Sequence, residues 1–288
     1  MNPNLMLIPY CKPHLNSAGI VAHLASLGLI INNSSYAQRQ IELLGYHRLR
    51  IYFLSRRDLT AHGKPFYPNV TFEHVISLYN DDRKIRSITF DAIGVFELLF
   101  RNAFSEKISA LYGSHPYMND CLYRHPDKKL PSLQFFTSTY LKSKDQRAKH
   151  YLETYEPFLP PIWILKEFFT FGQSINIFQA LSDSIQRDVA IFFGISERKV
   201  FESWLKCLLD LRNACAHHDR IFNKTFSKNP RLLRRANVPH SPANKLKALL
   251  ECLDYMTFNC NSATGSVTSV LDVITSPESN IIPLECGY

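Results

Sequence analysis

The sequence contains little glycine, no CxxC pair and no long run of apolar residues. Its ten glycines, with no Asn-Gly or Asp-Gly turn between alternating apolar segments, argue against a β-rich fold. Its seven cysteines, an odd number without CxxC spacing, argue against a disulfide framework and against a zinc ribbon. No apolar run reaches the roughly 18 residues that a membrane span requires. We therefore expect a globular protein without a structural metal, a cofactor or a membrane segment.

The first residues of the chain and its net charge indicate where the protein is found and what it binds. The segment MNPNLMLIPYCKPHL lacks the charged start and the long apolar run of a signal peptide, so we expect a cytoplasmic protein. The formal net charge of +8 favours an acidic partner, with nucleic acid ahead of an anionic membrane. An ordinary solvated basic surface is the alternative, and net charge alone does not decide between the two.

Apolar residues recur mostly at spacings of three and four, which predicts an all-α protein. Asn16 or Ser17 is expected to cap a first helix, and Ser34 or Ser35 a second. Further helices are expected from residue 46, over 72–112 with a break near 80, over 132–142 and 146–155, from 160 to about 172 with Trp163 in the core, from 196, and over 241–258. The segment 61–70 carries two prolines and a glycine and is predicted to be a connector. We expect an N-terminal helical lobe over 1–70, a helical bundle over 71–262, and a C-terminal tail over 263–288. The sequence does not decide whether this tail is helical.

The segment SWLKCLLDLRNACAHHDRIF, residues 203–222, holds the candidate site. On a helix, its apolar face would consist of Phe201, Trp204, Leu205, Leu208, Leu211, Cys215 and Ala216. Arg212 falls near the middle of this face, where an unpaired guanidinium would cost on the order of several kcal/mol. We therefore expect a phosphate, a carboxylate of a neighbouring helix or a second copy of the chain to meet it.

Two histidines follow this arginine. His217 comes five residues after Arg212, about 140° around an ideal helix, so the two side chains would not share a face. They converge only if the helix ends or bends near Ala216, or if two copies of the helix meet. A histidine beside a permanently charged arginine suits phosphodiester chemistry without a metal. For His217 alone a capping or core role is the alternative, and His218 is equally well explained as a helix cap. Cys215 is interpreted as a core residue.

Two further patterns point to nucleic acid. GYHRLRIYFLSRR, residues 45–57, interleaves arginines with aromatic residues, which is typical of a nucleic-acid-facing helix and equally of a docking helix with snorkelling arginines. The most concentrated positive charge follows the histidines, at Arg220, Lys224, Lys228, Arg231, Arg234 and Arg235. Glu97 and Arg101 stand at i,i+4 and form either a surface ion pair or a group in which Glu97 lies opposite Arg212 and orients it.

Four blocks of the sequence, in order, resemble signatures of the Abi family of bacterial abortive-infection proteins. They are GYHRLRIY at 45–52, DRKIR at 82–86, LPPIWILKEFFTFG at 159–172 and LRNACAHHDRIFN at 211–223, and the resemblance extends over roughly residues 12–258. The family pattern more often reads GYYRLSGY in the first block, so His47, Arg50 and Ile51 are departures. Gly94 and Val95 stand where the family more often has charged residues.

The Abi family belongs to the HEPN superfamily, so the resemblance implies a HEPN-type helical bundle with an N-terminal helical lobe. Members are commonly dimeric, carry an RNxxxH motif, and in many cases are metal-independent ribonucleases. The motif falls here on Arg212, Asn213 and His217, with His218 adjacent. The resemblance further implies that the histidine acts in acid-base cleavage using the RNA 2′-OH, that the arginine holds the scissile phosphate, and that the cleft forms between two protomers.

We therefore expect an endoribonuclease of an abortive-infection or toxin-antitoxin system, with Glu97 and Arg101 supporting the four motif residues. Its expected RNA-binding residues are Arg48, Arg50, Arg220, Lys224, Arg231, Arg234 and Arg235. The alternative is a non-catalytic HEPN module that holds a guide, repeat or antitoxin RNA. The expected partners are RNA, as substrate or as a regulatory non-coding RNA, a second copy of the chain, and, in a third interpretation, a protein antitoxin.

Overall fold

The computed structural model describes residues 11, 13–156 and 158–288, and most of the segment inspected for a leader peptide lies outside them. In this part the chain forms thirteen α-helices, four short 3-10 helices and no strand, so the predicted all-α class is confirmed. None of these helices combines the length and the apolar character needed to cross a membrane.

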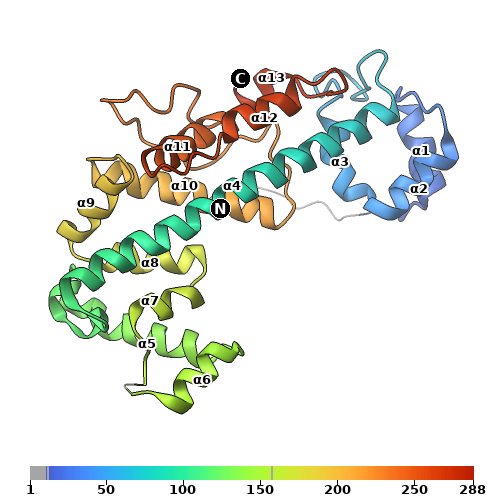
Figure 1. Ribbon diagram of the computed structural model, residues 1–288. Coiled ribbons are helices and arrows are strands. Elements are labelled where there is room, and N and C mark those ends of the chain that lie inside the picture. The colour runs from blue at the N-terminus through green and yellow to red at the C-terminus, as the bar shows by residue number, and fades with distance from the viewer. Residues whose placement is uncertain (1–10, 12, 157) are drawn as a thin grey trace, which may run out of the picture. The chain divides into compact units, whose positions relative to one another are not determined.

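The chain divides into two compact units. Unit 1 is Met1–Asp81 with Glu278–Asn280, and unit 2 is Asp82–Pro277 with Ile281–Tyr288. Helix α4 (Phe72–Tyr112) belongs to both and is unbroken, so the break expected near residue 80 is wrong (Figure 1). Its two aspartates at the division, Asp81 and Asp82, accept hydrogen bonds from backbone N–H groups of distant segments. Because these carboxylates bond to other segments, they do not disrupt the backbone hydrogen bonds of α4 itself.

Unit 1 begins with three helices, α1 (Ser17–Ser26), α2 (Ser34–Leu44) and α3 (Tyr46–Leu54). Asn16 caps α1 by accepting a hydrogen bond from Gly19 N at 2.8 Å, as expected. Asn33 caps α2 by accepting a hydrogen bond from Tyr36 N at 2.9 Å, so the cap expected at Ser34 or Ser35 is wrong by one or two residues. Gly45, with φ of 79°, ends α2 and precedes α3 directly.

Helix α3 places its aromatic residues inward and its arginines outward. Leu49, Tyr52 and Phe53 are buried, while Arg48 and Arg50 are exposed. Two later arginines of the same block act within unit 1: Arg56 Nη2 donates to Asn280 O at 2.8 Å, and Arg57 Nε donates to Lys64 O at 2.6 Å. The basic character of this block is thus divided between solvent-facing and structural arginines.

Unit 2 contains the remaining helices. Its α-helices are α5 (Lys129–Leu141), α6 (Gln146–Thr154), α7 (Ile162–Leu165), α8 (Phe171–Ala180), α9 (Asp183–Phe192), α10 (Arg198–Ala216), α11 (Leu246–Asn259), α12 (Ser266–Ile274) and α13 (Pro283–Cys286). Its 3-10 helices are η1 (Pro116–Met118), η2 (Asp120–Leu122), η3 (Pro126–Lys128) and η4 (Lys166–Phe168).

Two expectations about the helix after Pro161 are wrong. Gly172 does not end a helix but lies in the first turn of α8, because Thr170 and Gln173 form a capping box there. Trp163, predicted to be in the core, is 44% exposed. In the single turn of α7 the buried side is taken by Ile162 and Leu165, three residues apart, which leaves the tryptophan facing solvent.

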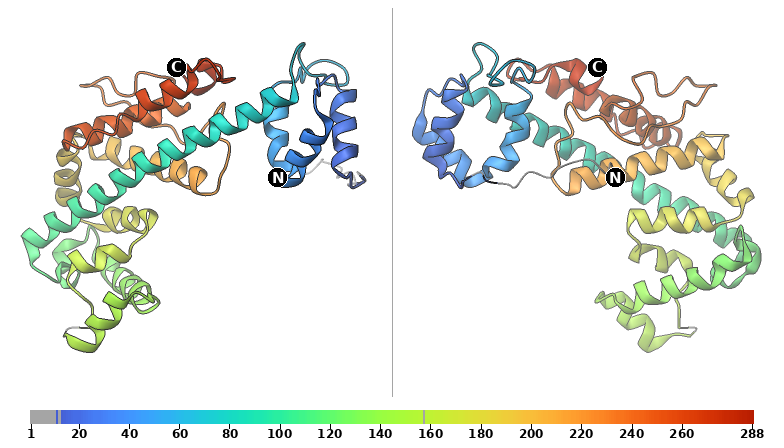
Figure 2. Two further views of the ribbon diagram at one scale, coloured as in Figure 1. Left: turned by 45° about the vertical axis from the view of Figure 1, so that its right-hand side comes forward. Right: turned by 180° about the vertical axis from the view of Figure 1, so that it is seen from behind.

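Helix α10 is packed against α8, α9 and α11 (Figures 1 and 2). Phenylalanine rings of α4 and α8 contact Phe201 of α10. Phe100 of α4 lies 6.0 Å from Phe201 of α10 between ring centroids, and Phe193 stacks on Phe201 at 5.4 Å. The fully buried Trp204 follows one turn later on the same face. This apolar core fixes the position of α10, whose last turn carries the candidate motif.

Candidate functional site

The end of α10 sets the backbone of the two histidines. The helix stops at Ala216, and His218 adopts a left-handed conformation with φ of 58°. His218 N donates to Cys215 O at 3.1 Å and Asp219 N donates to Ala214 O at 2.8 Å, which is the hydrogen-bond pattern of a Schellman motif. The backbone of His218 therefore ends the helix, one of the two roles left open by the sequence. His217, at the C-cap, is exposed.

A buried ion pair on α4 holds the segment that follows the histidines. Asp82 is fully buried and pairs with Arg86, which is 4% exposed. Asp82 Oδ1 also accepts hydrogen bonds from Ile221 N at 3.2 Å and Phe222 N at 2.8 Å. Arg86 Nη1 donates to Asp219 O at 3.3 Å. We call Asp82 and Arg86 the α4 clamp, because together they fix the backbone from Asp219 to Phe222.

Arg212 contacts α4 on another side of the helix. Its Nε lies 3.8 Å from Glu97 Oε2, and its guanidinium lies over the ring of Phe90 at 5.5 Å. We had expected Arg212 near the middle of the apolar face. Its side chain is 32% exposed and therefore lies at the edge of that face. The long side chain reaches outward past its apolar neighbours.

The carboxylate beside Arg212 serves two cations. Glu97 Oε1 also lies 3.3 Å from Arg101 Nη2, and Arg101 Nη1 donates to Phe169 O at 3.2 Å. Two guanidinium groups thus share one carboxylate, which leaves one positive charge in excess. The Nε atoms of Arg101 and Arg212 are buried without a hydrogen-bond partner. A further anion beside Arg212 would offset the excess positive charge.

A pocket of about 320 Å³ adjoins the end of α10; we call it the His217 pocket. It brings together Asn213 and His217, four residues apart on one helix face, and Lys224 of the following loop. Lys224 Nζ pairs with Asp219 Oδ2 at 3.6 Å and lies over the ring of Phe226. Arg212 does not line this pocket. Within one chain the structure therefore brings Asn213, His217 and Lys224 together and directs Arg212 elsewhere.

The other predicted RNA-binding residues do not line the His217 pocket. Arg48 and Arg50 are exposed on α3 of unit 1. Arg220 Nη2 donates to Asn223 O at 3.2 Å, and Arg235 donates to Gly194 O, so both hold loop backbone. Arg231 lines a second pocket on α10, and Arg234 is exposed.

Sequence reasoning gave no role to the α4 clamp. Asp82 and Arg86 stand at the two ends of the block DRKIR, and their spacing of four on a helix was a usable signal of a pair. Cys215 was interpreted as a core residue, and it is buried; burial raises the pKa of its thiol to about 12. Among the described residues, no group of three or more His, Cys, Asp or Glu side chains is arranged to hold a metal ion.

The left-handed backbone at His218 should affect the stability of variants at this position. His218→Gly is expected to be more stable than His218→Ala by about 1 kcal/mol, because only glycine adopts positive φ without a steric cost. Both variants delete the side chain, so their difference isolates the backbone, and urea unfolding measures it. The same pair at His217, where φ is −87°, is the control and should show the reverse order. Equal stability of the two variants at position 218 would contradict the described helix end.

Comparison with known proteins agrees with the order of the sequence blocks. The sequence model of the family described as Abi-like protein matches residues 39–223, which run from within α2 to just beyond α10 and include the α4 clamp, Asn213 and His217. No curated protein and no solved structure matches the chain. Because the family match covers more than half of the sequence, the chain belongs to the Abi-like protein family, which supports a role in abortive infection.

Proposed function

We propose that this protein is a metal-independent HEPN endoribonuclease of an abortive-infection or toxin-antitoxin system. The observation that carries the proposal is the shared pocket of Asn213, His217 and Lys224, with Arg212 on the same helix turn. An imidazole, an amide and an ammonium group around one pocket suit the cleavage of a phosphodiester. The α4 clamp fixes the loop between His217 and Lys224, which restricts where these two side chains lie, as a precise catalytic geometry requires.

The proposed reaction uses the nucleophile of the RNA itself. The 2′-oxygen attacks the adjacent phosphorus, the bond to the 5′-oxygen breaks, and a 2′,3′-cyclic phosphate and a 5′-hydroxyl form. His217 takes part in moving the proton from the 2′-OH to the leaving 5′-oxygen. Arg212 binds the phosphate through its planar fork, and its excess positive charge favours the negative charge of the transition state. Asn213 orients the phosphate or His217 by hydrogen bonding.

The separation of Arg212 from the His217 pocket leads us to place the complete site between two protomers. In that arrangement Arg212 of one protomer meets Asn213 and His217 of its partner. Phe90, over which Arg212 lies, is an exposed apolar residue of α4, and Val95 and Leu98 of the same helix are exposed as well, which supports an interface on α4. We propose a homodimer on this basis.

The test is a cleavage assay with purified protein. We expect single-stranded RNA to be cut in the presence of EDTA and to carry 2′,3′-cyclic phosphate ends, whereas DNA of the same sequence stays intact because it lacks the 2′-OH. The ends are identified by mass spectrometry of the products. Cleavage that EDTA abolishes, or products with 5′-phosphate ends, would contradict the proposed chemistry.

One observation favours the non-catalytic alternative. Arg212 is held by Glu97 and Phe90 within its own chain, which is compatible with a purely structural arginine. The protein would then bind RNA through its exposed cations and show no turnover. Salt-dependent RNA binding without any cleavage, by wild type and by His217→Ala alike, would establish this alternative.

A further inference from the structure

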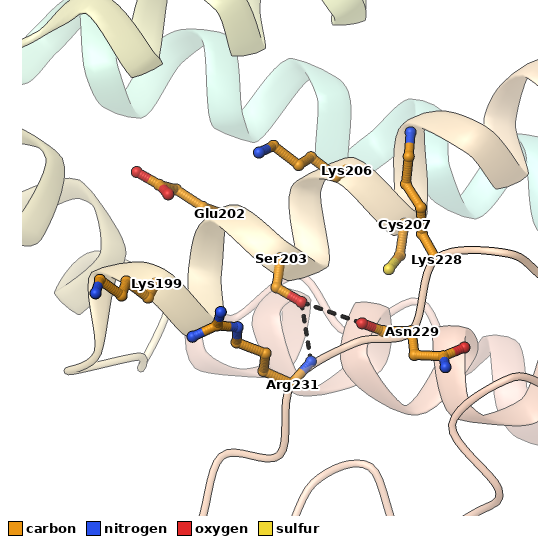
Figure 3. A pocket seen from close by; sticks show the side chains of 8 residues that line it. All are labelled: Lys199, Glu202, Ser203, Lys206, Cys207, Lys228, Asn229 and Arg231. Atoms are coloured by element: carbon orange, nitrogen blue, oxygen red, sulfur yellow. Dashed lines mark hydrogen bonds between the residues drawn. The ribbon is translucent and has the colours of Figure 1, made fainter.

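A second pocket on α10, of about 470 Å³, is surrounded by cations. It lies at the N-terminal half of the helix and is lined by Lys199, Glu202, Ser203, Lys206, Cys207, Lys228, Asn229 and Arg231 (Figure 3). We call it the Lys199 pocket. No function has been assigned to it above, and three of its four cations were not among the predicted RNA-binding residues.

Hydrogen bonds hold the loop that contains Lys228 and Arg231 against α10, so that its cations lie near those of the helix. Ser203 Oγ accepts a hydrogen bond from Arg231 N at 2.9 Å and donates to Asn229 O at 3.4 Å. The indole Nε1 of the buried Trp204 donates to Arg231 O at 2.8 Å. Figure 3 shows the guanidinium of Arg231 turned toward Lys199. The backbone of Arg231 is therefore fixed, and its side chain is left for another contact.

The positive charge of the pocket is largely uncompensated. Its one carboxylate, Glu202, pairs with Arg198, which lies outside the lining. Lys228 Nζ pairs with Asp210 Oδ1 at 2.9 Å. Among the described residues, no acidic side chain pairs with Lys199, Lys206 or Arg231, and all three are exposed. Gathering like charges in one place is unfavourable, so a site that does so favours an anionic ligand.

The Lys199 pocket adjoins the His217 pocket. The ion pair between Lys228 and Asp210 joins a lining residue of one pocket to a lining residue of the other. Residues 199, 203, 206, 210, 213 and 217 recur every three or four positions and so form one stripe along α10. From Lys199 to His217 the stripe is about 27 Å long. A ligand that reaches both pockets has to be an extended chain of phosphates and not a small phosphate compound.

Building on the proposed function, we propose that the Lys199 pocket is a phosphate-binding subsite that holds single-stranded RNA at a distance from the cleaved bond. The RNA backbone runs along the polar stripe of α10, with the scissile phosphate in the His217 pocket. Lys199, Lys206 and Arg231 bind phosphates of flanking nucleotides. The subsite makes affinity depend on RNA length and on salt, without reading the base sequence.

The test measures binding and not cleavage. Full-length protein and a 2′-O-methyl RNA of twelve nucleotides, which lacks the 2′-OH nucleophile, are titrated by fluorescence anisotropy at several salt concentrations. Lys199→Ala/Arg231→Ala is expected to weaken binding on the order of tenfold and to reduce the slope of log affinity against log salt by roughly 1.4, about 0.7 for each lost phosphate contact. Lys199→Arg/Arg231→Lys should restore the slope, because charge suffices for such a contact.

The matched control is Lys142→Ala/Lys144→Ala, which removes two exposed lysines elsewhere in unit 2 and changes the net charge equally. A slope that is unchanged in the Lys199→Ala/Arg231→Ala protein, or that falls equally in the control, would overturn the subsite. The fastening of the loop is not disturbed, since it uses backbone atoms of Arg231. If ordinary RNA is not cut while the slope falls as expected, the nuclease proposal fails and the subsite stands. If His217-dependent cleavage is found and the slope does not fall, the reverse holds.

Discussion

Asp82→Ala is expected to lower the free energy of unfolding of unit 2 by about 3–5 kcal/mol. The substitution leaves the guanidinium of Arg86, 4% exposed, without its carboxylate, and it leaves the N–H groups of Ile221 and Phe222 without their acceptor. A buried charge that has lost its partner is among the most costly defects in a protein core. Both tryptophans of the chain, Trp163 and Trp204, lie in unit 2, so tryptophan fluorescence during urea unfolding reports on this unit.

Two comparisons sharpen this prediction. Asp91→Ala removes an exposed aspartate from the same helix and should change the stability by less than about 0.5 kcal/mol. Asp82→Asn keeps an acceptor for the two N–H groups but removes the charge beside Arg86, so its effect should be intermediate. The backbone amides of Ile221 and Phe222 should exchange hydrogen faster in both Asp82 variants. An Asp82→Ala protein as stable as Asp91→Ala would show that the clamp does not hold the loop.

The largest expected effect on activity is that of His217→Ala, which should lower kcat for RNA cleavage by about 10²- to 10⁴-fold. Arg212→Ala is expected to cost about 10²- to 10³-fold, because it removes a charged donor aimed at the phosphate. Arg212→Lys should recover part of the loss, since an ammonium group keeps the charge but not the planar fork. His240→Ala and Arg187→Ala, which remove exposed residues outside the site, are the controls and should cleave as wild type does.

Mixing the two inactive proteins tests the composite cleft. If Arg212 of one protomer works with His217 of its partner, a mixed dimer of Arg212→Ala and His217→Ala contains one site with both residues intact. Random exchange of protomers should then restore roughly a quarter of the wild-type activity. No restoration, although mixed dimers are detected by native mass spectrometry, would place both residues of a site in the same chain.

Local signals in the sequence were sufficient for most of the helices. Asn16 and Gly45 act through their nearest neighbours, and the extent of α4 follows from spacings of three and four, although these did not show that the helix continues unbroken past residue 80. The signal failed at Gly172, because a glycine that follows a capping threonine is as compatible with a helix start as with a helix end. It also failed at Trp163, because one turn of helix is too short for periodicity to identify its buried side.

The candidate site could be predicted only in part, because its residues interact over long distances in the sequence. Asp82 meets Phe222 across 140 positions, and no pattern within either segment indicates this contact. The angle between Arg212 and His217 follows from helix geometry alone and agrees with their separation in the structure. The Lys199 pocket depends on where the loop of Lys228 and Arg231 rests against α10, which helix periodicity does not specify.

One helix, α4, supplies both Glu97, which meets Arg212, and Asp82, which anchors the loop behind His217. The spacing between the two contacts is therefore fixed by the geometry of one helix. Inserting one residue between them would turn one contact by about 100° relative to the other and move it by about 1.5 Å, so that arginine and histidine would lose their common frame. We therefore expect the segment between Asp82 and Glu97 to tolerate substitutions much better than insertions or deletions.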